Sequence, residues 1–131
     1  MMCADRFINY TLGIDSIDNG HLEIFKLLDE LILLIRGKNF IPAAIKLHVL
    51  RTTLDVHIEA ERALMVEHDY PYIEQHVVDS TQFVKRFVVM QNHIDAKHCP
   101  ASEVYDFEEA FVYHVDHSDR QFVNYITSVV A

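Results

Sequence analysis

The sequence contains few residues that interrupt helices or form crosslinks. It has three glycines, three prolines and no tryptophan among 131 residues, and its two cysteines, Cys3 and Cys99, stand far apart. Two such cysteines provide neither a disulfide framework nor a Cys-x-x-Cys spacing for zinc, so we expect two reduced thiols. Gly37, Pro42, Pro71 and Pro100 divide the sequence into four long stretches.

Long apolar runs and excess basic charge are also missing. Half of the residues are hydrophobic, but the run Leu31–Ile35 ends after five residues, far short of the roughly 18 needed for a membrane span. Eleven Lys and Arg against 20 Asp and Glu give a net charge of −9, which argues against a nucleic-acid partner. The first residues do not resemble a secretory signal. We therefore expect a cytoplasmic protein with no membrane and no nucleic-acid partner.

Helical periodicity fills four stretches of the chain. The first runs from about 18 to 36 and the second from Pro42 to about 67, while Pro71 opens the third and Ser102 is a plausible N-cap for the fourth. The predicted loops, at about 37–41, 69–70 and 96–101, are short, and short connections make neighbouring helices antiparallel. The sequence predicts an all-α fold: one domain over residues 1–131, an up-down-up-down antiparallel four-helix bundle, with residues 1–17 as an extended N-terminal arm.

Six possible metal ligands recur on the apolar stripes of these four helices. One helix carries His21, the next His57 and Glu61, the third His76, and the fourth His114 and Asp119. Each signal is weak alone, because a histidine on an apolar stripe is usually a hydrogen-bonded core residue and a His-x-x-x-Glu pair usually lies on the surface. Six of them converging in one core favour a cation there, since buried charge without a partner is costly.

The spacing of the last pair requires a distortion. Asp119 follows His114 by five residues, about 140° around an ideal helix, so it reaches the same centre only through a bent or π-bulged turn. The alternative is a surface acid beside Arg120. Imidazole with carboxylate suits iron, manganese or zinc, and two carboxylates that can each bridge suit a pair of ions.

These blocks together resemble the hemerythrin family over nearly the whole chain. The matching segments are Tyr10-Thr11-Leu12-Gly13-Ile14-Asp15-Ser16-Ile17-Asp18-x-x-His21, then His57-x-x-x-Glu61 with Leu64-Met65 and Tyr70-Pro71, then His76 with Phe83, and His114-x-x-x-x-Asp119. The resemblance implies a non-haem di-iron site, with two iron ions (Fe2+/Fe3+), an oxo or hydroxo bridge, and dioxygen or another small diatomic as ligand.

The resemblance also implies a role for each residue. His21 and His57 would hold the iron with the open position, His76 and His114 would hold its neighbour, and Glu61 and Asp119 would bridge the pair. The apolar residues expected to exclude water around the oxygen are Ile24, Phe25, Leu64 and Phe111. The implied function is oxygen and metal binding, as a carrier, store or sensor, rather than catalysis.

The chain departs from the family at one ligand. The third-helix block of the family has two histidines spaced i, i+4, whereas here Ser80 follows His76, and a hydroxyl is a poor ligand for iron. The neighbouring Asp79 could also turn inward. The vacancy keeps two alternatives open: a di-iron redox enzyme that handles peroxide or nitric oxide, or an altered module that holds one ion, zinc or none.

The remaining histidines are predicted to lie on the surface, and the oligomeric state is left open. These histidines are His48, His68, His93, His98 and His117, the last standing closest to the site because it follows His114 by three residues.

Overall fold

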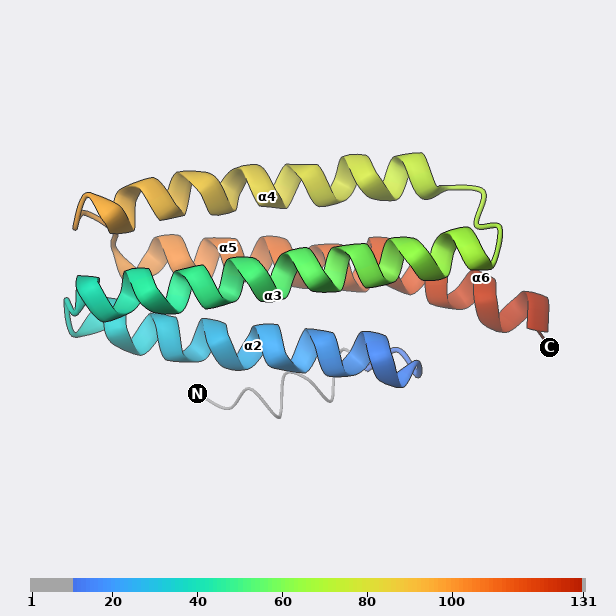
Figure 1. Ribbon diagram of the computed structural model, residues 1–131, viewed down its shortest axis with the longest axis horizontal. Helices are drawn as coiled ribbons and strands as arrows, with labels where there is room; N and C mark the ends of the chain where they lie inside the picture. The colour runs from blue at the N-terminus through green and yellow to red at the C-terminus, as the bar shows by residue number, and fades with distance from the viewer. Residues whose placement is uncertain (1–10, 131) are drawn as a thin grey trace.

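Four long helical segments form the fold. The computed structural model describes the backbone of residues 11–130 and the side chains of residues 11–128. The elements are α2 (Asp15–Arg36), α3 (Phe40–Glu67), α4 (Ile73–Asp95), α5 (Ala101–His114), the π-helix η1 (Val115–Asp119) and α6 (Arg120–Val130). The last three form one continuous helical segment (Figure 1). Cys3 and the first ten residues of the predicted arm lie outside the described residues.

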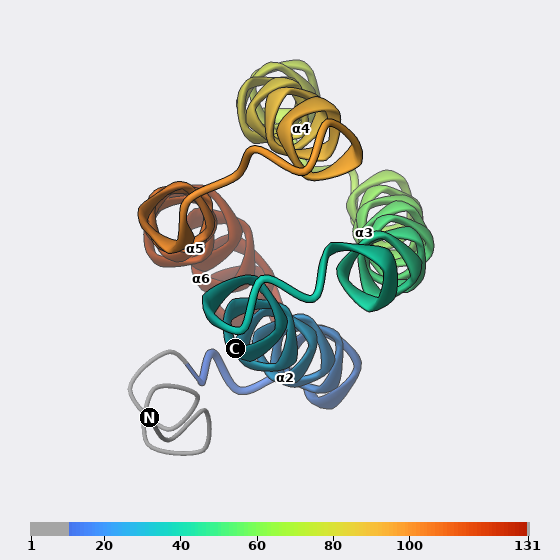
Figure 2. The same ribbon diagram turned by 90° about the vertical axis from the view of Figure 1, so that its left-hand side faces the viewer.

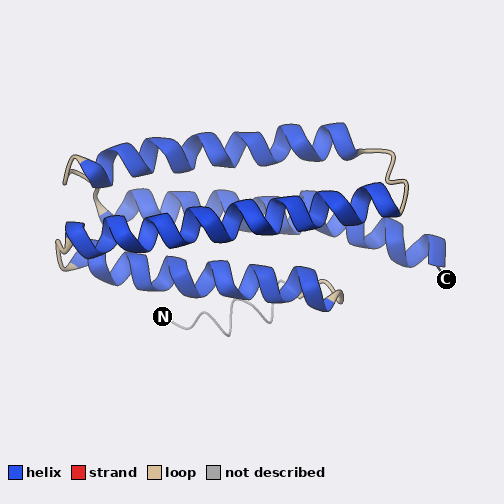
Figure 3. Ribbon diagram, in the orientation of Figure 1, coloured by secondary structure: helices blue, strands red, loops and turns tan. Residues whose placement is uncertain are grey.

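The helices enclose a common interior. Helix α2 contacts α3, α3 contacts α4, α4 contacts α5, and α5 returns to α2. Viewed end-on, the four segments stand at the corners of a closed arrangement (Figure 2). The connections between them are short, and residues 11–130 contain no strand (Figure 3). The predicted antiparallel four-helix bundle is confirmed.

The helix ends differ by a few residues from the prediction. Helix α2 begins at Asp15 rather than near Asp18, so the arm is shorter than predicted. Asp18 holds the preceding chain in place, because its carboxylate accepts hydrogen bonds from the backbone N–H groups of Leu12 at 2.8 Å and Gly13 at 2.9 Å. Ser102 is not the N-cap of the fourth helix, because α5 begins at Ala101 after Pro100.

The apolar residues divide into two clusters. The larger, called the main cluster here, contains the fully buried Phe25, Phe87 and Phe111 among aliphatic residues of all four helices. The smaller, called the end cluster, consists of Ile17, Met65, Tyr70, Phe122 and Val123. Fully burying such a side chain contributes about 1.5–3 kcal/mol, so the two clusters supply most of the driving force for folding. In the part of the chain that is described, no helix has the length and apolar character of a membrane span.

Candidate metal centre

A polar layer separates the main cluster from the end cluster. Along α2, His21 stands between Ile17 of the end cluster and Ile24 of the main cluster. Along α3, His57 and Glu61 stand between Leu54 and Met65 in the same way. The third and fourth helices repeat the pattern with His76 and with His114 and Asp119. Each helix therefore contributes its titratable residues at the same depth of the bundle.

The six predicted ligands meet in two groups of donor atoms. One group is His21, His57, Glu61 and Asp119, and the other is Glu61, His76, His114 and Asp119. The donor atoms of each group lie within 4.8 Å of one another, and every member is buried. Both groups contain the same two carboxylates. The structure therefore has a buried site that could hold a metal, with two His side chains on each side of a shared Glu and Asp.

The π-helix places Asp119 in this site. Residues Val115–Asp119 form a π-helical turn directly after His114, so the five-residue spacing brings both side chains to the interior. Asp119 is 0% exposed, and the alternative of a surface acid beside Arg120 is wrong. Arg120 instead donates a hydrogen bond to Asp116 at 3.0 Å, on the outside of the same segment.

Asp119 is the centre of the polar contacts. Its two carboxylate oxygens accept hydrogen bonds from Nε2 of His21 at 2.9 Å and from Nε2 of His76 at 2.7 Å. Nε2 of His114 lies 3.1 Å from Oδ1 of Asp119, but the two atoms are not aligned for a hydrogen bond. Three imidazoles from three helices therefore face one carboxylate. A positive charge held between them, on a proton or on a metal ion, would be shared among the three rings.

Glu61 has a different environment. Its Oε1 lies 3.3 Å from Nε2 of His57 and its Oε2 lies 3.9 Å from Nε2 of His21. Among the residues that the structure describes, neither oxygen has a hydrogen-bond partner, although the side chain is only 1% exposed. An ionised carboxylate buried in this way costs several kcal/mol unless a cation compensates it. Both oxygens are thus available to a metal.

The electrostatic environment favours the charged forms of Asp119, His57 and His114. Burial alone would raise the pKa of Asp119, but His114, together with hydrogen bonds from His21 and His76, lowers that pKa well below its usual range. Burial alone would lower the pKa values of His57 and His114, but Glu61 raises the pKa of His57 and Asp119 raises that of His114. The layer therefore holds negative charge that attracts protons, and a metal ion would compete with those protons for the imidazoles.

Ser80 lies inside the bundle one turn after His76. It is 5% exposed, and its hydroxyl has no hydrogen-bond partner within residues 11–128. Asp79 does not turn inward to replace it: its carboxylate accepts hydrogen bonds from Gln75 at 2.9 Å and from Ser118 at 3.2 Å. The second donor group consequently has two imidazoles and no third.

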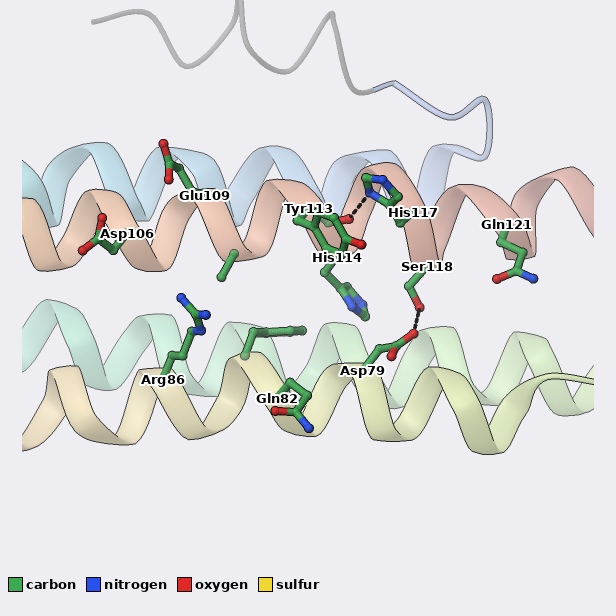
Figure 4. A pocket seen from close by; sticks show the side chains of 12 residues that line it. Asp79, Gln82, Arg86, Asp106, Glu109, Tyr113, His114, His117, Ser118 and Gln121 are labelled. Carbon is green, nitrogen blue, oxygen red and sulfur yellow. Dashed lines mark hydrogen bonds between the residues drawn. The ribbon is translucent and has the colours of Figure 1, made fainter.

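Two cavities reach this side of the site from the surface. One, of about 580 Å³, lies between α4 and the α5–η1 segment, and its wall includes His114 (Figure 4). The ring of His114 points from α5 towards α4, whereas His117 lies at the outer side and contacts the backbone oxygen of Tyr113 at 2.9 Å (Figure 4). The other, of about 280 Å³, lies between α3 and α4 and reaches His76 and Ser80.

The predicted surface histidines are all at least partly exposed. His48, His93, His98 and His117 are exposed, and His68 is half-buried at the end of α3. Nδ1 of His93 forms a hydrogen bond with the carboxylate of Glu103 at 2.7 Å, in the last turn of α4 and away from His76 in its first turns. Cys99 is a free, buried thiol whose pKa is raised to about 11 by burial and by Glu103. It belongs to the main cluster and to neither donor group.

Three of the four predicted apolar residues line one side of the polar layer. Ile24, Phe25 and Phe111 are each 0% exposed and belong to the main cluster. The ring of Phe111 packs edge-on against His21, with centroids 5.7 Å apart. Leu64 is partly buried and packs against the end cluster instead, on the opposite side of the layer.

Sequence reasoning missed Gly20. A Cβ added at this position would overlap Nδ1 of His57 and lie 2.9 Å from its Cε1. Because Gly20 has no side chain, the ring of His57 can lie against α2, where its centroid is 4.6 Å from that of the His21 ring. The available signal was a glycine inside a helical stretch, directly before a ligand, where it weakens the helix and so needs a packing reason.

No protein-family model matches the chain, and neither a curated protein nor a solved structure matches it.

Proposed function

We propose that this chain is a hemerythrin-like, non-haem di-iron protein that binds dioxygen. The observation that carries the proposal is the pair of donor groups that share Glu61 and Asp119. A single ion would use one group and leave two buried imidazoles of the other without a role. Two ions use both, with each carboxylate serving as the bridge between them.

The residues present fit a pair of iron ions. Nε2 of His57, both carboxylate oxygens of Glu61 and both ring nitrogens of His114 are buried without a hydrogen-bond partner among the described residues. Such atoms are costly unless something polar satisfies them. The donors are imidazole and carboxylate, and Cys99 lies elsewhere, which favours iron over thiolate-preferring metals.

In this proposal each helix provides defined metal ligands. His21 and His57 would hold one iron, His76 and His114 the other, and Glu61 and Asp119 would bridge. A pair of ferrous ions would supply the two electrons with which dioxygen binds reversibly. The protein orients the ligands: Gly20 sets the approach of His57, and the π-helix sets the direction of Asp119.

The apolar side of the layer would protect the bound gas from water. Phe25 and Phe111 pack edge-on with centroids 5.4 Å apart, and both are fully buried beside His21. A dry wall of this kind excludes proton donors other than those the protein provides. We propose that Ile24, Phe25 and Phe111 form this wall. Dioxygen would then bind beside His21 and His57, the position that the resemblance to hemerythrins implies.

Metal analysis combined with optical spectra tests the proposal. The purified chain should contain two irons per molecule, absorb in the near ultraviolet when oxidised, and gain a visible band when the reduced form meets air. A colourless protein with one zinc or less than one iron per chain contradicts it. Oxygenation that reverses under vacuum distinguishes a carrier, store or sensor from an oxidase.

A second candidate function is peroxide or nitric oxide handling by the same iron pair. The cavity that reaches His76 and Ser80 supports it, because it gives a small reactant access to the donor group beside Ser80, where hemerythrins have a further histidine. Consumption of peroxide or nitric oxide over many turnovers by the iron-loaded protein would favour this function over reversible oxygen binding.

A further inference from the structure

The cavity between α3 and α4 has an apolar wall and a polar floor. Its volume is about 280 Å³, compared with about 30 Å³ for one water molecule in the liquid, so a small ring compound fits. The residues at the wall and floor are Ile58, Met65, Val77, Val84, His76 and Ser80. A passage of this composition admits a molecule with an apolar body and directs one end of it to His76 and Ser80.

The hydroxyl of Ser80 is unusual for a helix. Serine and threonine in helices commonly satisfy their hydroxyls on the backbone oxygen four residues earlier. The adjacent Thr81 does so, donating to the backbone oxygen of Val77 at 2.8 Å. Ser80 lines the cavity but does not do so, and its hydroxyl oxygen stays buried without a partner among the described residues. A buried polar group of this kind implies something that satisfies it.

The charges at the cavity favour an uncharged occupant. Asp55 and Arg62 are the charged residues that line it, and they have opposite signs. Each already has a partner, since Asp55 lies 3.1 Å from Arg51 and Arg62 lies 3.5 Å from Glu59. The mouth of the cavity therefore offers no net field that would attract an anion.

We propose that this cavity is a binding site for a small, uncharged nitrogen-donor heterocycle that contacts Ser80 and completes the donor group of His76 and His114. The inference rests on the proposed metal pair and deepens it. It places an exchangeable ligand on the side of the site away from Phe25 and Phe111. The larger cavity of Figure 4 is a poorer candidate, because the hydroxyl of Ser118 there already donates to Asp79.

Imidazole is the probe for this site. The iron-loaded protein is titrated with imidazole at a pH where imidazole is neutral, and binding is followed by calorimetry and by the absorption spectrum. We expect one imidazole per chain. The matched variants are Val77→Phe, which narrows the cavity, and Val78→Phe, its exposed neighbour on α4 that does not line it. Val77→Phe should weaken binding at least tenfold, and Val78→Phe should leave it unchanged.

Ser80→His is the second variant. It places an imidazole on the protein itself, so added imidazole should no longer bind while both irons are retained. Protein that holds two irons but binds no imidazole, or binds it equally well after Val77→Phe, overturns the inference and leaves the proposed function standing. Azide binding more tightly than imidazole at this cavity overturns the assignment of an uncharged ligand. A chain that takes up no metal overturns the proposed function.

Discussion

Replacing Gly20 with alanine is the sharpest test of the site. The new Cβ would overlap Nδ1 of His57 and lie 2.9 Å from Cε1, whereas ordinary van der Waals contact begins at 3.4 Å. The ring must therefore retreat by at least 0.5 Å. Metal–ligand distances tolerate only about 0.2 Å, so the change should lower metal affinity by about 10–100-fold, as changes to residues that support ligands do.

The effect on stability is smaller than the effect on metal binding. Overpacking a buried site costs about 1–3 kcal/mol, while replacing glycine by alanine within a helix recovers about 1 kcal/mol. We expect a net loss of about 0–2 kcal/mol in the protein stripped of metal, measured by urea unfolding. Metal affinity is measured by competition with a chelator of known strength.

Gly37→Ala is the matched control for this variant. A Cβ at Gly37 would approach Nδ2 of Asn39 to 2.7 Å, but that atom is the end of an exposed side chain that can move. Gly37→Ala should therefore change neither stability nor metal affinity by a measurable amount. Wild-type metal affinity in Gly20→Ala would refute the argument that Gly20 positions His57.

Three further changes probe the other residues of the layer. Glu61→Ala should remove both metal ions together, since one bridge serves both, and retention of two ions on metal analysis would contradict the bridging role. Ser80→His should raise iron occupancy or the lifetime of the oxygen adduct, and an unchanged metal content and spectrum would count against an open ligand position. After removal of metal by a chelator, stability in urea should fall as the pH rises above about 6.5, because the folded pKa values of His57 and His114 are raised above that value. Their contribution is complete below pH 6.5 and disappears as the pH passes the raised values, so stability that does not fall over this range would contradict the assigned charges.

The bundle was predictable because its helices carry regular apolar stripes. Leu50, Leu54 and Leu47 recur on one face of α3, and the same period holds in the other helices, so the number and order of helices follow from the sequence. The first residues of the helices were harder to predict from the sequence. Helix α2 begins early because Asp18 binds the backbone of Gly13, a contact across a turn that periodicity does not reveal.

The site was predictable to the same extent, and for a related reason. The six donors stand on the apolar stripes, so a correct bundle brings them together, and the five-residue step to Asp119 implied the π-helix. The contacts that hold the donor side chains in position were not predictable in this way. The contact of Gly20 with His57 joins two helices at one depth, and the pairing of Asp79 with Ser118 depends on how η1 faces α4.

The π-helix has a consequence for everything that follows it in the chain. Its wider turn sets the rotational phase of α6, and Phe122 of the end cluster is buried only in that phase. Losing one residue between His114 and Asp119 would shorten their spacing to i, i+4, which an ordinary α-helix already places on one face. A regular α-helix over the present sequence would instead turn the carboxylate of Asp119 and the ring of Phe122 away from the interior by about 100°. The π-helix is therefore required by folding as strongly as by the chemistry of the centre.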